Sequence, residues 1–99
     1  MEIKRTQTGD AEVLTLTGRL DTTTAPKLQE TLTEVMRSAV NVELDFAEVE
    51  YVSSAGLRVL LQGEKNSKAA GKSMILKNVS PEVMEVFDVT GFTGILTIQ

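Results

Sequence analysis

The sequence contains neither histidine nor cysteine. Without histidine the chain lacks the usual general base of serine and cysteine hydrolases and the commonest protein ligand of zinc and iron. Without cysteine it has no disulfide and no thiolate metal site, a composition that fits the cytosol. We therefore expect a cytoplasmic protein with no metal site, no cofactor and no histidine-assisted nucleophile.

Aromatic residues are also few, with one tyrosine and three phenylalanines. Together with a net charge of −4, this disfavours a nucleic-acid surface, which needs basic side chains and stacking platforms. No apolar run approaches the roughly 20 residues that span a bilayer, and residues 1–5 lack the apolar stretch of a signal peptide. We expect no membrane association. The carboxylates, hydroxyls and lysines that remain suit recognition better than catalysis, so we do not expect an enzyme.

The length of 99 residues suits one domain, which we place over residues 1–99. Apolar periodicity and turn residues predict strands over residues 3–6, 13–17, 41–46, 74–76 and 95–98. They predict three helices, with starts near Pro26, at Ser53 or Ser54, and at Ser80-Pro81. Residues 47–52 are predicted to be a short link, and Gly71 and Gly91 to end the second and third helices.

This order of elements predicts an α/β fold with a mixed, mainly parallel sheet, because after the first hairpin each strand is followed by a helix. If successive strands lie side by side, right-handed crossovers place the helices mostly on one face. The strand order itself stays open. In the second helix the expected inward residues are Leu57, Leu60 and Leu61, and the expected solvent-facing ones are Gln62, Glu64, Lys65 and Lys68.

The candidate site is the junction between the third strand and the second helix, because functional groups of α/β sheets gather beyond the carboxyl ends of strands. Ser53 and Ser54 stand at this junction. Either serine fits as a simple N-cap. A phosphate on Ser54 would also be stabilised by the free amides and the dipole of the helix. A serine nucleophile is disfavoured, since Val52 replaces the first glycine of a G-x-S-x-G elbow and no histidine is present.

Two aspartates end strands near this junction. Asp21 follows the second predicted strand, where it either contacts a partner or helps cap the first helix. Asp45 stands near the end of the third, and for it we favour a structural role, with hydrogen bonds from backbone N–H groups of the following loop.

Four segments of the chain resemble the STAS domains of bacterial anti-sigma factor antagonists. The most specific is VELDFAEVEYVSSAGLRVLL at residues 42–61. The others, in the same order as in the family, are LTGRLD at residues 16–21, NVSPEV at 78–83 and VFDVTGF at 86–92. The resemblance covers nearly the whole chain and implies a small STAS-type α/β fold.

The resemblance also implies a function in partner switching. In this family the unphosphorylated antagonist binds an anti-sigma factor, which is an ATP-dependent serine kinase of the histidine-kinase-like fold, and so releases a sigma factor. The kinase phosphorylates one serine of the antagonist, which weakens the complex, and a metal-dependent serine phosphatase restores it. The resemblance therefore implies a phosphoprotein of signal transduction and transcription regulation.

Aligned through Gly56-Leu57, the phosphorylated serine of the family falls on Ser54 and its acidic residue falls on Asp21. Many members have aspartate just before the phosphorylated serine, and this chain has Ser53 there, which makes Ser53 a less favoured second acceptor. The docking surface implied by the resemblance is Asp21, Ser53, Ser54, Ala55, Gly56, Leu57 and Arg58.

Two other hypotheses remain open from the sequence. The chain could be a scaffold module of a larger signalling complex whose serine is never modified. A weaker alternative is a nucleotide held at the start of the second helix; no G-x-x-x-x-G-K-[ST] loop is present to support it.

Overall fold

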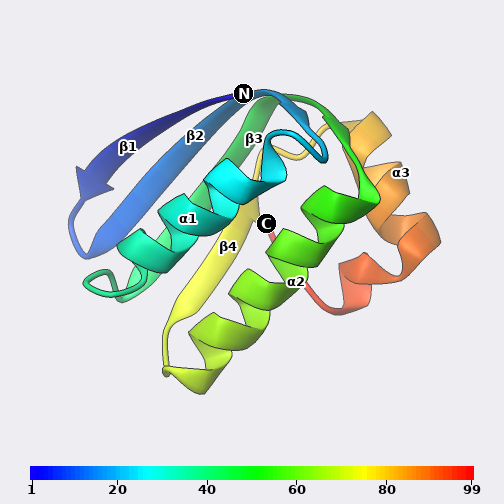
Figure 1. The fold of residues 1–99 in the computed structure, drawn as a ribbon. Coiled ribbons are helices and arrows are strands. Elements are labelled where there is room, and N and C mark those ends of the chain that lie inside the picture. The colour runs from blue at the N-terminus through cyan, green and yellow to red at the C-terminus, as the bar shows by residue number, and fades with distance from the viewer.

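A five-stranded mixed sheet with the strand order β1-β2-β3-β4-β5 forms the base of the molecule (Figure 1). The computed structural model describes residues 1–99. The strands are β1 (Glu2–Thr8), β2 (Ala11–Leu20), β3 (Asn41–Val52), β4 (Ser73–Lys77) and β5 (Thr97–Ile98). β1 is antiparallel to β2 and the other neighbours are parallel. The predicted mixed, mainly parallel sheet is confirmed, and the strand order is simply sequential.

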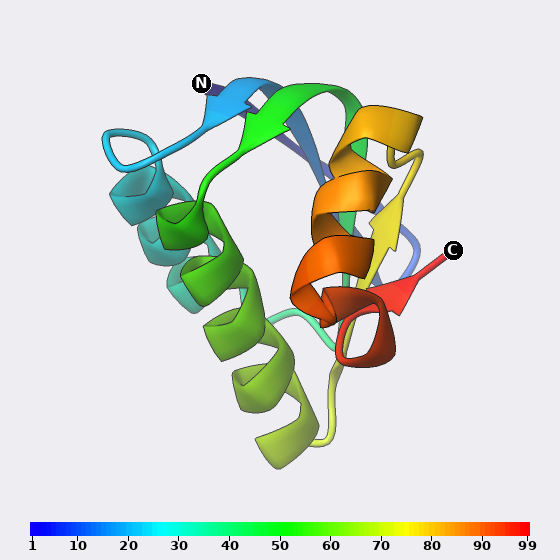
Figure 2. The ribbon, with the colours of Figure 1, turned by 90° about the vertical axis from the view of Figure 1, so that its right-hand side faces the viewer.

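Three helices connect the parallel strands: α1 (Ala25–Val35), α2 (Ser54–Ala69) and α3 (Pro81–Thr90). α1 and α2 lie side by side over one face of the sheet, and α3 stands apart from them near the ends of β3 and β4 (Figure 2). None of these helices is long and apolar enough to cross a bilayer.

The core lies between the sheet and the helices, and the strands contribute to it the side chains that point inward at alternate positions. Leu14, Leu44 and Leu76 form a row across three paired strands, and all are fully buried. α3 joins the same core, where Phe87 meets Phe46 edge-on with ring centroids 6.2 Å apart. The opposite face of the sheet is only half-buried and holds the ion pair of Lys77 with Glu43 at 3.1 Å.

The predicted link over residues 47–52 is wrong, because β3 continues to Val52. Two register shifts against β2 each insert one extra residue into β3, as β-bulges do. Buried residues therefore fall at Phe46, Val49 and Val52, three apart. That spacing breaks the alternation by which strands are recognised in a sequence.

The expectation that Glu64 faces solvent is also wrong. Its side chain is buried, with its Oε1 accepting a hydrogen bond from the backbone N–H of Thr97 at 3.1 Å and its Oε2 3.8 Å from Lys68 Nζ. Glu64 follows Leu60 by one helical turn and so shares its inward face. The short strand β5 supplies the donor that makes a buried carboxylate acceptable there.

The C-terminal segment differs in part from its prediction. A 3-10 turn at Phe92–Gly94 follows α3, and β5 covers only Thr97–Ile98 instead of residues 95–98. The backbone N–H of Leu96 bonds to the carbonyl of Phe92 at 2.8 Å, which keeps the chain turning at Ile95. Gly91 ends α3 in the left-handed conformation with φ of 81°, as predicted.

Candidate functional site

The carboxyl ends of β2 and β3 meet at one edge of the sheet and bring Asp21 and Ser53 onto neighbouring chain segments. Leu20, the last residue of β2, is paired with Val52, the last residue of β3. Asp21 follows the first and Ser53 follows the second. The backbone N–H of Ser53 donates to the carbonyl of Leu20 at 2.8 Å. The predicted proximity of Asp21 to the start of α2 is therefore confirmed, and a backbone hydrogen bond maintains it.

The two serines have different places at the start of α2. Ser53 is the N-cap, with extended backbone at ψ of 175°, and its Oγ accepts a hydrogen bond from the N–H of Gly56 at 3.4 Å. Ser54 is the first helical residue, and its exposed hydroxyl has no hydrogen-bond partner within the protein. The capping role that the sequence allows to either serine belongs to Ser53, which leaves the Ser54 hydroxyl free.

Gly56 lets α2 approach the end of β2 closely. A Cβ atom at this position would lie 2.6 Å from Cγ of Leu20 and 3.1 Å from its carbonyl oxygen. Both distances are shorter than ordinary van der Waals contact. The glycine thus brings the first turn of the helix, with its serines, against the residue that precedes Asp21.

Asp21 is oriented by the threonines that follow it. Its Oδ1 accepts hydrogen bonds from the hydroxyl of Thr23 at 2.7 Å and from the backbone N–H groups of Thr23 and Thr24 at 3.0 and 3.2 Å. These bonds, above all that of the Thr23 hydroxyl, hold the pKa of Asp21 below its ordinary value despite some desolvation. The carboxylate stays charged and half-exposed, and its Oδ2 lies 3.9 Å from Arg19 Nε.

Arg19 and Tyr51 form a contact at the same edge that sequence reasoning missed. The two residues are register partners, and the Arg19 guanidinium lies 4.3 Å from the centroid of the Tyr51 ring, within the range of a cation–π interaction. Recognising residues 47–52 as a strand would have provided the signal, because only the pairing places Tyr51 beside Arg19.

Asp45 has the structural role favoured from the sequence. Its Oδ1 accepts hydrogen bonds from the backbone N–H of Ala47 and from the side-chain amide of Asn78, both at 3.0 Å. The first bond spans the bulge in β3, and the second ties the end of β4 to it.

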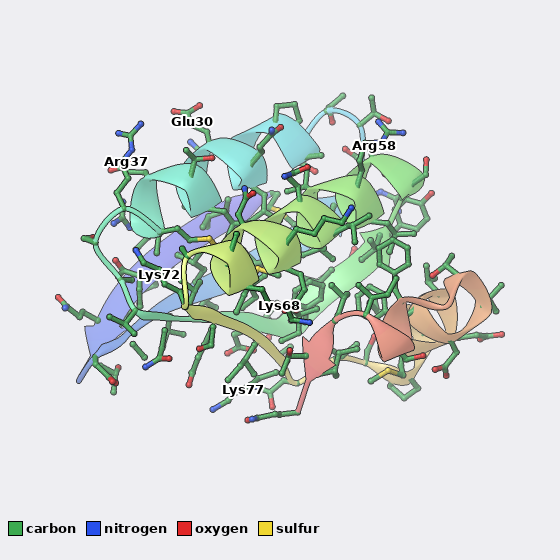
Figure 3. All side chains as sticks on the ribbon, turned by 90° about the horizontal axis from the view of Figure 1, so that it is seen from below. Glu30, Arg37, Arg58, Lys68, Lys72 and Lys77 are labelled. Carbon is green, nitrogen blue, oxygen red and sulfur yellow. The ribbon has the colours of Figure 1, made fainter.

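The remaining residues of the predicted docking surface differ in exposure. Arg58 is exposed, Ala55 is half-buried, and Gly56 and Leu57 are buried. Arg58 lies at the N-terminal end of α2, away from Lys68 (Figure 3), and it makes no ion pair. That these residues contact a partner stays a prediction; on geometry Gly56 and Leu57 can act only by holding the surface in place.

No three carboxylates gather in a way that could hold a metal ion. A hollow of about 260 Å³ lies between α1 and α2, and its lining includes Leu32, Met36, Val59, Gly63 and Ala70 but not Asp21, Ser53, Ser54 or Arg58. It is separate from the edge where the ends of β2 and β3 place Asp21 and Ser53. The candidate site combines the Ser54 hydroxyl, which has no partner within the protein, with the Asp21 carboxylate, which Thr23 and Thr24 orient. It also includes the Arg58 guanidinium, which makes no ion pair.

Comparisons with known proteins agree with this fold. A family model described as "Mlab, STAS domain" matches residues 3–97. An anti-sigma-B factor antagonist of Listeria monocytogenes is 30% identical over 101 residues, covering 100% of this chain and 87% of the relative. One from Bacillus subtilis is 31% identical over 84 residues, covering 85% of this chain and 77% of the relative.

Solved structures share the fold. The anti-sigma factor antagonist SpoIIAA in its unphosphorylated form has a TM-score of 0.81 at 20% identity, with 99% of this chain and 88% of that chain covered. The phosphorylated form of Bacillus SpoIIAA has a TM-score of 0.76 at 19% identity, with 99% and 91% covered. The chain belongs to the STAS domain family that includes the bacterial anti-sigma factor antagonists.

Proposed function

We propose that this protein is an anti-sigma factor antagonist that acts by partner switching. Unphosphorylated, it binds an anti-sigma factor that is also a serine kinase, and phosphate on Ser54 releases it. The observation that supports this most directly is the free, exposed hydroxyl of Ser54 at the first position of α2, in a chain of this family. In this function the protein is substrate and binding partner, not an enzyme.

The charge of a phosphate explains why modification would break a complex. A phosphoserine has about −1.5 to −2 charges near neutral pH. On Ser54 this charge would appear on an exposed surface that already includes the Asp21 carboxylate. A partner that fits a neutral hydroxyl would have to desolvate the phosphate or accept the added repulsion.

The hydrogen bonding of the two serines favours Ser54 as the acceptor. The Ser53 hydroxyl caps α2, so transfer of a phosphoryl group to its oxygen would disturb the helix cap. The Ser54 hydroxyl gives up no bond within the protein when it is phosphorylated. The first free amides of α2 also lie beside a group placed at this position, where they stabilise negative charge.

The other components follow from the same proposal. The kinase would supply Mg-ATP and the catalytic base, and a metal-dependent serine phosphatase would remove the phosphate. The cycle would take place in the cytoplasm and would control transcription that depends on one sigma factor, without contact between this protein and nucleic acid or membrane.

The proposal is tested by incubating the protein with its cognate kinase and ATP and locating the phosphate by mass spectrometry. We expect one phosphate, lost in Ser54→Ala and retained in Ser53→Ala, which is the matched control. Equal phosphorylation of Ser54→Ala would refute the site. In binding assays Ser54→Asp should weaken kinase binding at least tenfold, about 1.4 kcal/mol; unchanged binding would support an unmodified scaffold instead.

A further inference from the structure

The outer surface of α2 near Ser54 has one charged side chain, Arg58. Residues four apart on a helix lie on the same face, with Cβ atoms roughly 5–6 Å apart, so Arg58 stands one turn beyond Ser54. Both side chains are exposed. Figure 3 shows Arg58 at this end of the helix.

Arg58 has no carboxylate to pair with in the unmodified protein. It is absent from every ion pair of the structure, and the first turn of α2 contains no acidic residue. The only carboxylate of the helix, Glu64, is buried, and the cation near it is Lys68. Asp21 is bonded to Thr23 and Thr24 and lies nearest to Arg19. The Arg58 guanidinium therefore has no ion-pair partner in the unmodified protein.

A phosphate on Ser54 would supply what Arg58 lacks. Guanidinium binds phosphate with two parallel N–H···O bonds, the geometry for which its planar fork is suited. The order is also the favourable one, since an anion four residues before a cation agrees in sign with the helix dipole.

We propose that Arg58 is the intramolecular counter-ion of phosphorylated Ser54 and, in the unmodified protein, a docking group for a carboxylate of the partner. This rests on the proposed function, since it concerns the same serine. The two uses compete, because a carboxylate that approaches a guanidinium already paired with the phosphate meets the like charge of that phosphate. Phosphorylation then acts twice at the docking surface: it adds negative charge and it withdraws a positive group from the partner.

The pairing can be measured without any kinase. Phosphoserine is installed at position 54 during translation, and the second ionisation of its phosphate is followed by phosphorus NMR in a pH titration. A neighbouring cation favours the dianion, so the phosphate pKa, ordinarily about 6, should be about 0.3 lower in the phosphoprotein than in the phosphoprotein with Arg58→Gln.

Lys65→Gln is the matched control, since Lys65 is an exposed cation of the same helix without an ion pair. It lies seven residues beyond Arg58, about 10 Å further along the axis. We expect its phosphate pKa to equal that of the unsubstituted phosphoprotein. Equal values for Arg58→Gln and the unsubstituted phosphoprotein, or equal shifts in both variants, would overturn the pairing.

The docking half of the inference is tested with unphosphorylated protein and the anti-sigma factor. Arg58→Gln should weaken binding several-fold, while Lys65→Gln should leave it unchanged; equal binding by Arg58→Gln and the unsubstituted protein would overturn this half. Because phosphoserine is installed by translation, a kinase that fails to modify Ser54 would sink the proposed function and leave the measured pairing standing.

Discussion

Helices α2 and α3 begin with the same cap and differ in the residue that follows it. Ser53 and Ser80 both have extended backbones, and each Oγ accepts a hydrogen bond from the N–H three residues on, at 3.4 Å to Gly56 and 3.3 Å to Val83. The next residue is Ser54 in α2 and Pro81 in α3. Proline at this position stabilises a helix start and has no side-chain group to modify, whereas serine adds a hydroxyl that the fold does not use.

The third helical position differs as well. Val83 is a buried side chain of the core, and Gly56 allows α2 to touch Leu20. In α3 this position therefore contributes to core packing. In α2 the absence of a side chain at Gly56 lets the first turn lie against Leu20, the residue that precedes Asp21. The candidate site therefore arises from two residue choices, Ser54 and Gly56, on a helix start that α2 shares with α3.

Gly56→Ala should have the largest effect on stability. Its Cβ would lie 2.6 Å from Leu20 Cγ and 3.1 Å from the Leu20 carbonyl, and backbone moves less easily than a side-chain tip, so we expect a loss of about 2 kcal/mol in the free energy of unfolding. Urea unfolding measures it.

Gly63→Ala is the control in the same helix. The nearest atom to its added Cβ is Sδ of Met74 at 2.8 Å, near the end of a flexible side chain. The better helix propensity of alanine, worth roughly 1 kcal/mol, should offset that adjustment and leave stability close to that of the natural protein. An equal loss in both variants would show that Leu20 is not the cause.

The two caps should be equivalent in stability and different in function. Ser53→Ala and Ser80→Ala each remove one side-chain cap and should cost about 1 kcal/mol in urea unfolding. Only changes at the start of α2 should alter binding of the anti-sigma factor. A binding loss in Ser80→Ala matching its loss of stability would mean that folding, and not the α2 surface, governs the interaction.

The start of α1 gives the smallest expected effect, which appears only in acid. Thr24 provides no side-chain cap, and Asp21 bonds to the N–H groups there instead. The pKa of Asp21 is lower in the folded protein than its ordinary value of 3.8 in an unfolded chain. The charged carboxylate therefore stabilises the fold at pH values above 3.8, and this contribution is lost as the pH falls through the lowered pKa.

Urea midpoints at pH 6 and in acid should therefore differ less for Asp21→Asn than for the natural protein. Thr23→Ala removes the hydroxyl donor that contributes most to the shift. In that variant a carbon-13 NMR titration should find the Asp21 pKa closer to its ordinary value. An unchanged Asp21 pKa would show that the Thr23 hydroxyl is not the cause.

Local signals predicted much of this molecule. Ser80, Pro81 and Gly91 bound α3 as expected, because a cap, a first-turn proline and a left-handed glycine each act within a few residues. The serine pair likewise located the start of α2. Local signals failed at Val49 and Val52, where bulges shift the spacing of buried residues, and at Glu64, whose partner Thr97 is 33 residues away in the chain.

Short-range patterns in the sequence were enough to predict the order of helices and strands, the mixed and mainly parallel sheet, a serine cap at the start of α2 and the motifs of the family. The strand order, the extension of β3 and the burial of Glu64 could be seen only in the folded molecule. The folded structure also showed that Ser54 and Arg58 are free of partners within the protein. These depend on groups distant in the chain that packing and backbone hydrogen bonds bring together.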